Sequence, residues 1–361
     1  MSFVRIYQGA VLYFFMVFDE IFNNQLQMTI TFFSTQNYDR LYFDRHNSRN
    51  HTLRYVEVAL NEHTAALAAG SDAVCVFVND QVTATALRQL ATAGIRLIAL
   101  RCAGFNNVDL AAAADAGIAV VRVPDYSPYA VAEHALALIM TLNRKTHKAY
   151  NRVREGNFSL DRLTGFDLFG KTVGVVGTGK IGAVFCEIML GLGCRVLAHD
   201  VVENPSLLAK EVQYLPLQQL LAASDIVSLH CPLTPQTHHL INTDSLRLMR
   251  RGAMLINTGR GGLIHTKVVI DALKTGQLGY LGLDVYEQEE HLFFRDFSET
   301  IIEDDQITRL TSFPNVLITS HQAFFTDEAL TEIAQVTFQN MADFEDGSPL
   351  ANAVRLPGNR I

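Results

Sequence analysis

KTVGVVGTGKIGAVFCEIMLGLGCRVLAHD, residues 171–200, is the stretch that decides the fold. Its first part, Thr172–Val176, is a short apolar run rich in valine, which predicts a buried strand. The glycine-rich turn 177–182 follows at once and leads into an apolar helical pattern. A second strand, Arg195–Ala198, then delivers Asp200. Strand, glycine turn, helix, strand and acid follow one another at the spacing of a dinucleotide-binding unit.

Each residue of the turn has a physical reason to be there. Gly177 permits the tight turn out of the strand, Gly179 lets a pyrophosphate approach the backbone, and Gly182 lets the helix pack close to the sheet. Asp200 follows about 20 residues later, where a carboxylate can accept hydrogen bonds from ribose hydroxyls and disfavours a 2′-phosphate. The pattern therefore predicts NAD rather than NADP. A glycine turn that serves packing alone would leave Asp200 without a role.

Length and composition bound the class of protein. The chain has 361 residues, enough for two domains, and 49% of them are hydrophobic. The net charge of -8 does not favour binding to nucleic acid, which is itself negatively charged. The five cysteines are scattered and show no CxxC spacing, which predicts reduced thiols of a cytoplasmic protein and no metal site. They are Cys75, Cys102, Cys186, Cys194 and Cys231.

Residues 1–27 stand apart from the rest of the chain. Ala10–Phe18 is strongly apolar but far too short to span a bilayer, and no small-residue cleavage site follows it. Met28 opens an ordinary first strand. We expect residues 1–27 to be a non-native or disordered extension, with translation starting at Met28 and no membrane partner. A membrane-touching segment is the alternative.

Strands alternate with helices along most of the chain, which predicts an α/β protein with two doubly wound, Rossmann-like parallel-sheet domains and a cleft between them. The NAD-binding domain is expected over 126–324, and a discontinuous substrate domain over 28–125 plus 325–361. Further strands are expected at Met28–Phe33, Tyr55–Leu60, Asp72–Val78, Arg96–Leu100, Ile118–Val123, Ile226–Leu229, Ala253–Asn257, Tyr280–Val285 and Val316–Thr319. One long helix is expected over Ala130–Arg154 and a last one over Asp327–Glu345, whereas 286–312 has the composition of an irregular surface excursion.

Three polar residues lie just past strand ends of the second domain, where open parallel sheets bind their ligands. Arg260, between glycines, suits a carboxylate substrate. His321 titrates in a range that suits proton donation to a carbonyl, and Glu289 could hold its imidazole. With NADH, this set amounts to a 2-keto acid reductase. From spacing alone, His321 could equally be a surface or core histidine, and Glu289, beside Glu287 and Glu290, part of a solvated acidic face.

Several motifs in order strengthen that hypothesis. TGKIG, HCPLTP, NTGRGGLI, GLDVYE and SHQAF together resemble the D-isomer-specific 2-hydroxyacid dehydrogenase family. RCAGFNNVDL, VPDYSPYAVAEHA, LTGFDLFGKT and LFFRD resemble the fermentative D-lactate dehydrogenases within it. The resemblance runs from about Met28 to near the end of the chain, and residues 1–27 match nothing in the family.

The resemblance implies an NAD-dependent enzyme that converts pyruvate and NADH to D-lactate and NAD⁺. It places the substrate-binding arginine at Arg260, the histidine-pairing glutamate at Glu289 and the proton donor at His321. It implies cofactor contacts at Gly177, Gly179, Lys180, Ile181, Gly182, Asp200, Cys231, Pro232, Thr237, Thr258, Gly259, Arg260 and Asp284. It also suggests substrate contacts from Ala103, Gly104 and Tyr126, and a homodimer or homotetramer with the long helix after Pro128 in its interface.

The chain departs from the family pattern at two places. His265 stands where an acid is usual; that acid caps the following helix, and Thr266 could substitute for it. Ser320 stands where many relatives have proline. Two rival functions stay open: a reductase of glyoxylate, hydroxypyruvate or a bulkier 2-keto acid, and an NAD(H)-sensing binding protein like the corepressors that resemble this family.

Overall fold

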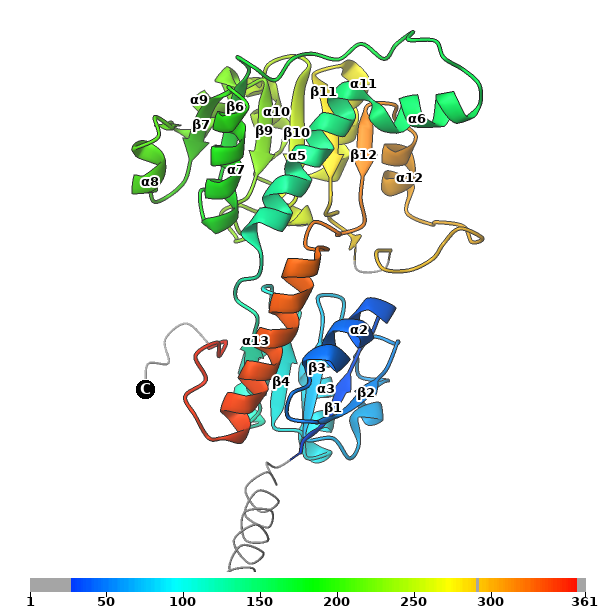
Figure 1. Ribbon diagram of the computed structural model, residues 1–361, viewed down its shortest axis with the longest axis vertical. Coiled ribbons are helices and arrows are strands. Elements are labelled where there is room, and N and C mark those ends of the chain that lie inside the picture. Colours follow the sequence, from blue (N-terminus) through cyan, green and yellow to red (C-terminus); the bar gives the residue numbers. More distant parts are fainter. Residues whose placement is uncertain (1–26, 290–291, 356–361) are drawn as a thin grey trace, which may run out of the picture. The chain divides into compact units, whose positions relative to one another are not determined.

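The valine-rich run 172–176 forms β6, an inner strand of a seven-stranded parallel sheet. The computed structural model describes residues 27–289 and 292–355 (Figure 1). Within them the chain divides into two compact units, 27–126 with 327–355 and 127–326. The expected extension, apart from its last residue, lies outside the described residues.

The second unit carries β6 and the glycine turn. Its strands are β6 (Thr172–Val176), β7 (Arg195–His199), β8 (Gln213–Tyr214), β9 (Ile226–Leu229), β10 (Ala253–Asn257), β11 (Leu278–Leu283) and β12 (Val316–Ile318). Its helices are α5 (Pro128–Arg144), α6 (Thr146–Arg154), α7 (Lys180–Gly191), α8 (Pro205–Leu208), α9 (Leu217–Ala223), α10 (Thr243–Leu248), η2 (Gly261–Leu263), α11 (Thr266–Thr275) and α12 (Asp305–Thr311).

The strand order of this sheet is β12-β11-β10-β9-β6-β7-β8, with all neighbours parallel. The chain therefore moves outward from β6 in one direction through β7 and β8, and then in the other through β9 to β12. Ligands of doubly wound sheets bind where the order reverses, outside the carboxyl ends of the strands. The glycine turn lies at that point, between β6 and β9.

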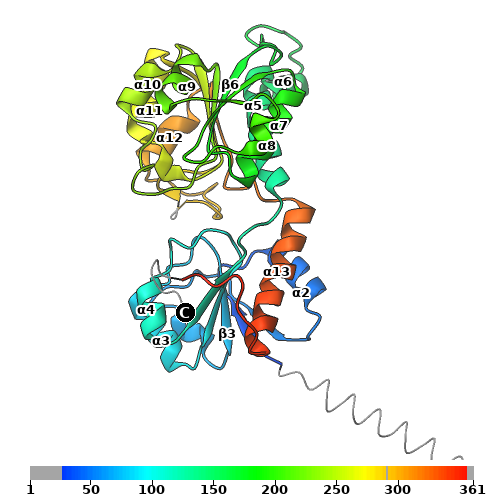
Figure 2. The same cartoon turned by 90° about the vertical axis from the view of Figure 1, so that its left-hand side faces the viewer.

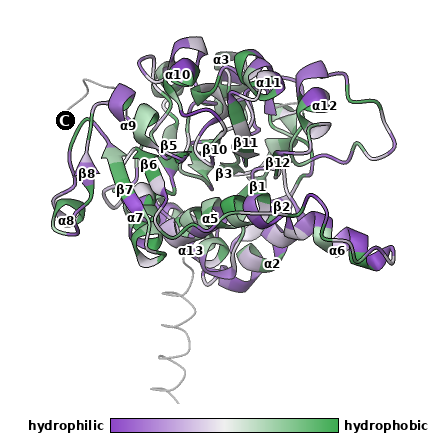
Figure 3. Ribbon diagram, turned by 90° about the horizontal axis from the view of Figure 1, so that it is seen from above, coloured by the Kyte–Doolittle hydropathy of each residue, from purple (hydrophilic) through white to green (hydrophobic). Residues whose placement is uncertain are grey.

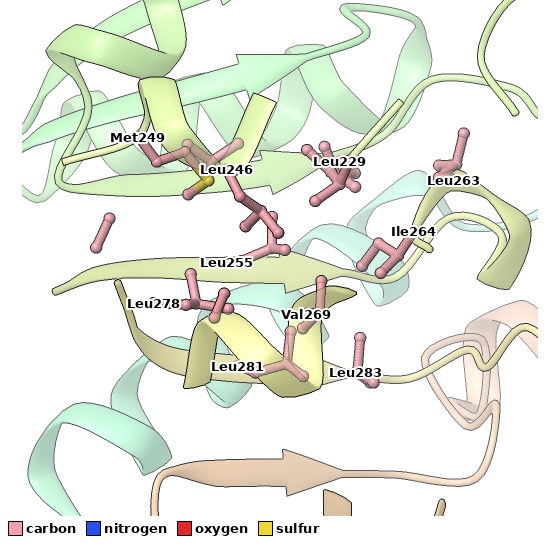
Figure 4. Packing of buried hydrophobic residues seen from close by; sticks show 14 of the residues in the cluster. Leu229, Leu246, Met249, Leu255, Leu263, Ile264, Val269, Leu278, Leu281 and Leu283 are labelled. Carbon is pink, nitrogen blue, oxygen red and sulfur yellow. The ribbon is translucent and has the colours of Figure 1, made fainter. Parts of the chain in front are cut away.

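Helices cover both faces of the sheet (Figure 2). One face packs against α5 and α7 through a cluster that includes Leu138, Phe185 and Met189. The other packs against α9 to α12, and Figure 4 shows leucines of β10 and β11 meeting side chains of α10 and α11. Strands β6, β9 and β10 are apolar, whereas α6 is largely hydrophilic (Figure 3). Burial on both faces explains why these strands are continuous apolar runs.

The first unit has a five-stranded parallel sheet of order β2-β1-β3-β4-β5. Its strands are β1 (Thr29–Phe32), β2 (Thr52–Tyr55), β3 (Ala73–Val76), β4 (Leu97–Leu100) and β5 (Ala119–Arg122), and its helices are α2 (Asn37–His46), η1 (Ala65–Ala68), α3 (Ala84–Thr92), α4 (Leu110–Asp115) and α13 (Asp327–Glu345). The last of these, α13, comes from the end of the chain and packs beside α2. Phe338 meets Phe43 edge-on, 5.6 Å between ring centroids.

The predicted fold class, two doubly wound parallel sheets, is confirmed. No helix of the described residues combines the length and the apolar character needed to cross a bilayer.

Three element predictions were wrong in detail. The second strand is Thr52–Tyr55 rather than Tyr55–Leu60, because it is an edge strand whose side chains alternate between exposed and half-buried and it contains no apolar run. The excursion 286–312 is not wholly irregular: Asp304 caps α12 by accepting hydrogen bonds from the Gln306 and Ile307 N–H groups.

The expected long helix 130–154 is two helices. Lys145 adopts left-handed backbone angles (φ 51°) and separates α5 from α6. Its ammonium donates to the Thr164 carbonyl at 2.6 Å. Two residues earlier, Asn143 is bound through its side chain to the N–H and C=O of Phe166, at 2.7 Å each. These contacts with a later loop fix the break.

Candidate active site

The glycine turn has the geometry that its sequence predicts. Gly177 has a positive φ of 93°, and a Cβ there would collide with the backbone of Cys231 after β9. A Cβ on Gly182 would collide with the Gly177 carbonyl, so α7 could not approach the strand as closely. Gly179 faces open space instead, with no atom within 4 Å of a Cβ built on it. The turn is therefore tight toward the protein and open at the start of α7.

Asp200 lies directly after β7, beside this turn. Its Oδ2 accepts hydrogen bonds from the N–H and hydroxyl of Thr178, at 2.5 and 3.0 Å, and its Oδ1 accepts from the Val201 N–H at 2.7 Å. Burial alone would raise the pKa of Asp200, but these hydrogen bonds and one from the Val202 N–H outweigh it and hold the pKa below its usual value. The carboxylate is therefore ionised at neutral pH.

Most of the other residues predicted to meet the cofactor follow β9, which neighbours β6 in the sheet, or β10, the next strand beyond β9. Cys231 and Pro232 directly follow the β9 loop residue His230. The Thr237 hydroxyl donates to the Pro232 carbonyl at 2.7 Å, which closes the loop after β9. The Thr258 hydroxyl, after β10, is buried and has no hydrogen-bond partner among the described residues. An orphaned buried hydroxyl is the kind of atom that a ligand completes.

Arg260 follows β10 on the loop 258–263. Asn257 shapes this loop: its side chain donates to the Arg260 carbonyl at 2.8 Å and accepts from the Gly259 N–H at 3.0 Å. Arg260 itself donates from Nη1 to the Gly259 carbonyl at 2.7 Å. A Cβ on Gly261 would collide with the backbone of Tyr286, so this loop packs tightly against the turn that follows β11.

His321 and Glu289 form a hydrogen-bonded pair. His321 Nδ1 lies 2.8 Å from Glu289 Oε1, and Glu289 Oε2 accepts from the Tyr286 N–H at 2.8 Å. A carboxylate only accepts, so Nδ1 carries the proton and Nε2 is the atom left to exchange one. His321 has a left-handed φ of 50°, uncommon outside glycine, and its N–H donates to the Asp284 carbonyl at 2.8 Å.

Asp284 holds the loop on which His321 lies. The carboxylate is fully buried and accepts from the Thr319 hydroxyl at 2.5 Å and from the N–H groups of Gln322 and Ala323 at 2.9 Å each. His134 of α5 lies within 3.3 Å of the same carboxylate. Burial would raise the pKa of Asp284, but the hydrogen bonds from His134, Thr319 and Ala323 lower it overall.

The structure thus brings Arg260, Glu289 and His321 to the carboxyl ends of three neighbouring strands, β10, β11 and β12. The remaining predicted substrate residues belong to the first unit. Ala103 and Gly104 follow β4, where the Ala103 carbonyl accepts from Arg122 at 2.7 Å and the Gly104 carbonyl from the Cys102 thiol at 3.3 Å. Tyr126 ends the first unit. A carboxylate contact by Ala103 and Gly104 stays a prediction, and their amide N–H groups are the ones suited to it.

A family model fits this architecture. Residues 136–323 match the D-isomer specific 2-hydroxyacid dehydrogenase, NAD binding domain, model. The chain belongs to the D-isomer-specific 2-hydroxyacid dehydrogenases. The predicted family is therefore confirmed, and this dehydrogenase is an NAD-dependent oxidoreductase.

Relatives cover nearly the whole chain. This dehydrogenase is 54% identical over 321 residues to 2-hydroxyacid dehydrogenase A of Aspergillus oryzae, which spans 88% of this chain and 92% of that protein. It is 49% identical over 326 residues to the D-lactate dehydrogenase of Escherichia coli, spanning 90% and 99% respectively. The solved structure of the pyruvate reductase of Chlamydomonas reinhardtii matches with a TM-score of 0.87 and 47% identity, over 91% of this chain and all of that one.

The residues of this dehydrogenase fit NAD. Gly179 leaves the start of α7 open, where helix N–H groups and the helix dipole favour a phosphate. Asp200 offers an ionised carboxylate one strand away, and the Thr258 hydroxyl is an unsatisfied group at the same edge of the sheet. When bound, NADH supplies the hydride for reduction of a carbonyl.

Sequence reasoning missed part of the site. Glu287 is not simply part of a solvated acidic face: its Oε2 accepts from the N–H and hydroxyl of Thr266, the first residue of α11. The expectation that Thr266 replaces the missing acid as cap was therefore wrong, because Glu287 binds the helix start from another loop. The buried links from His134 and Thr319 to Asp284 were missed too. The available signal for Thr319 was its position directly after an apolar strand, β12, whereas Glu287 lies four residues past the end of β11.

Proposed function

We propose that this dehydrogenase reduces pyruvate to D-lactate with NADH, reversibly. The observation that carries the proposal is the pair formed by His321 and Glu289, which follow β12 and β11, in the same sheet as β10, the strand that leads to Arg260. Similarity to relatives named D-lactate dehydrogenase and pyruvate reductase supports the choice of substrate.

His321 has the role of proton donor in pyruvate reduction. Its Nδ1–H is held by Glu289, so Nε2 of the protonated imidazole gives its proton to the substrate oxygen as the carbonyl is reduced. The Glu289 carboxylate keeps the ring oriented and stabilises its positive charge. In lactate oxidation, neutral Nε2 accepts the hydroxyl proton instead.

Arg260 has the role of substrate anchor. The guanidinium is a planar fork that can bind both oxygens of a carboxylate, which orients a 2-keto acid and distinguishes it from a simple ketone. The backbone N–H groups of Ala103 and Gly104 are proposed to assist with the same carboxylate, and Tyr126 to border the substrate.

The cofactor roles proposed from the sequence divide by chemistry. Gly177, Gly179, Lys180, Ile181 and Gly182 border the pyrophosphate, and Asp200 binds the adenosine ribose. Cys231, Pro232, Thr237, Thr258, Gly259 and Asp284 line the rest of the nucleotide site. The five cysteines are free thiols, in keeping with the proposed cytoplasmic location.

We further propose a homodimer or homotetramer. Large apolar side chains are exposed on α5, α6 and the segment that follows them: Tyr129, Tyr150, Phe158, Leu160 and Phe169. Leu160 and Phe169 are 81% and 80% exposed, and a second copy of the chain covering this surface would bury them. Light scattering coupled to size-exclusion chromatography tests this, because a monomer at micromolar concentration would contradict it.

The experiment that tests the substrate is NADH oxidation by the purified protein with a panel of 2-keto acids, followed by chiral analysis of the product. Fast turnover of pyruvate to D-lactate is the expected result. A clear preference for glyoxylate, hydroxypyruvate or phenylpyruvate would keep the mechanism and replace the substrate. NADH binding without turnover of any of them would contradict the proposal.

A further inference from the structure

Glu287 bridges two parts of the second unit that are far apart in sequence. Its Oε1 lies 2.6 Å from His239 Nε2, and its Oε2 accepts from the Thr266 N–H at 3.0 Å and hydroxyl at 2.8 Å. Because the carboxylate accepts, His239 Nε2 carries the proton in this bond. One carboxylate thus binds an imidazole and the start of α11 at once.

The residues of this bridge lie on the loops that carry the proposed site. His239 is two residues after Thr237, and its N–H donates to the Gly262 carbonyl at 2.8 Å, on the Arg260 loop. Glu287 belongs to the turn 286–289, which ends at Glu289. The two bonds of His239 therefore connect the loop after β9 with the loops after β10 and β11.

The bridge is under local constraint. His239 adopts a left-handed φ of 51°, a conformation that costs free energy for a residue with a side chain. Gly261 packs so tightly on the turn that a Cβ would collide with the backbone of Tyr286 and Glu287. His239 joins three closely packed loops in a strained conformation, so contacts with its surroundings must hold it there. Its side chain is held by the hydrogen bond to the Glu287 carboxylate.

The surroundings of Glu287 are rich in imidazoles. The ring centroid of His239 lies 3.8 Å from that of His238 and 4.6 Å from that of His265, the residue that replaces the usual acid. An acid at position 265 would set a second carboxylate close to this bridge, whereas His265 adds none. In the described part of the chain no group of such residues has a metal-binding arrangement. His239 is the imidazole of this cluster that binds the Glu287 carboxylate.

We propose that Glu287 and His239 are a positioning pair that holds the loops of Thr237, Arg260 and Glu289 in register for the reaction. The inference rests on the proposed function of those loops. In this proposal neither Glu287 nor His239 exchanges a proton with the substrate. Both act through the three loops that they join. Small displacements of reacting groups are costly in turnover, since about 1 Å can lower a rate by roughly 100-fold.

The test compares Glu287→Ala, Glu287→Gln, His239→Ala and the double alanine variant with a matched control, Asp225→Ala. Asp225 also bridges a cation and a backbone N–H in the second unit, with Arg250 at 2.7 Å and the Thr172 N–H at 2.9 Å. It directly precedes β9, so it lies at the amino ends of the strands, whereas the proposed site lies at their carboxyl ends. Kinetics for pyruvate and NADH, the dissociation constant of NADH and the melting temperature are measured for all of them.

Positioning predicts a pattern that lost stability alone does not produce. Glu287→Ala and His239→Ala should each lower kcat/KM for pyruvate by roughly 10- to 100-fold, with part of the loss in kcat. The double variant should be no worse than either, because the two residues act through one bond. Glu287→Gln should recover much of the loss, since an amide can still accept from Thr266 and donate to the other tautomer of His239.

Two outcomes would overturn the inference: kcat/KM within twofold of wild type in both alanine variants, or equal losses in Asp225→Ala at an equal drop in melting temperature. Measuring NADH binding distinguishes a failure of this inference from a failure of the proposed function. If the wild-type protein reduces no 2-keto acid, a rise of about 3- to 10-fold in the NADH dissociation constant of Glu287→Ala, and none in Asp225→Ala, still supports the pair. An unchanged constant refutes it.

Discussion

His321 Nδ1 lies 2.8 Å from Glu289 Oε1, and the two residues reach each other from the ends of adjacent strands, β12 and β11. The pair is fixed at both ends. Tyr286 donates its N–H to Glu289, and Asp284 accepts the N–H of His321. The imidazole therefore has one orientation in which Nδ1 is satisfied, and Nε2 is the atom that we propose to face the substrate.

Replacing His321 by alanine should lower kcat for pyruvate reduction by about 100- to 10,000-fold, the usual contribution of a positioned general acid. The dissociation constant of NADH should change little, because the proposed role is proton transfer. Stopped-flow turnover and a fluorescence titration measure the two effects. His63→Ala, an exposed histidine of the first unit, is the control and should behave as wild type. Near-normal turnover of the His321 variant would exclude it as the proton donor.

Arg260→Ala should act mainly on the carboxylate. We expect a large rise in KM for pyruvate together with a lower kcat, because the anchor also orients the carbonyl. Arg260→Lys should recover only part of kcat/KM, since an ammonium restores the charge but not the two-pronged geometry. Steady-state kinetics with Arg247→Ala as the surface control test this. A variant that lost NADH binding but kept its KM for pyruvate would argue against the substrate role.

Asp200 should decide the choice between NADH and NADPH. Its hydrogen bonds hold its pKa below the usual value, so the group is negative at neutral pH and repels a 2′-phosphate. Asp200→Ala should lower kcat/KM for NADH and raise the NADPH-to-NADH ratio of kcat/KM. The ratio is measured with each cofactor at saturating pyruvate. An unchanged ratio would place the ribose recognition elsewhere.

His230 should make the folded state sensitive to acid. Burial lowers the pKa of its imidazole to about 4, whereas an unfolded histidine titrates near 6.5. The unfolded state therefore binds more protons between these values, and the stability that depends on a neutral His230 is lost as the pH falls from about 6.5 toward about 4. Urea unfolding at a series of pH values measures this, and His230→Gln should flatten the curve in that window. Parallel curves for the two proteins would contradict the prediction.

The glycine turn and the inner strands could be predicted from the sequence because their physics is local. Thr172–Val176 is buried on both faces and so reads as an unbroken apolar run. Gly177 has a positive φ, which favours glycine, and Gly182 must lie against the Gly177 carbonyl of the same turn. Arg260 and His321 could be predicted from the sequence because each lies three residues past the end of a short apolar strand, β10 or β12.

What the sequence did not reveal depends on contacts between distant segments. The break at Lys145 follows from the bonds of Asn143 to Phe166, 23 residues away. The partner of Glu287, His239, is 48 residues away, so the local acidic run pointed to a solvated surface. The edge strand β2 has no apolar run because only alternate side chains are partly covered. The prediction therefore placed the strand at the neighbouring residues 55–60 instead.

Because α13 comes from the end of the chain, the two units are completed differently during synthesis on the ribosome. The sheet of the first unit is complete once Arg122 has been made, but α13, which packs against β4 and β5, begins only at Asp327, 205 residues later. At usual rates of synthesis this interval is roughly 10 to 40 s. During it the nascent sheet lacks one of its covering layers, while the contiguous second unit emerges whole. Chaperone demand should therefore fall on the first-made part of the chain, although it is the last to finish folding.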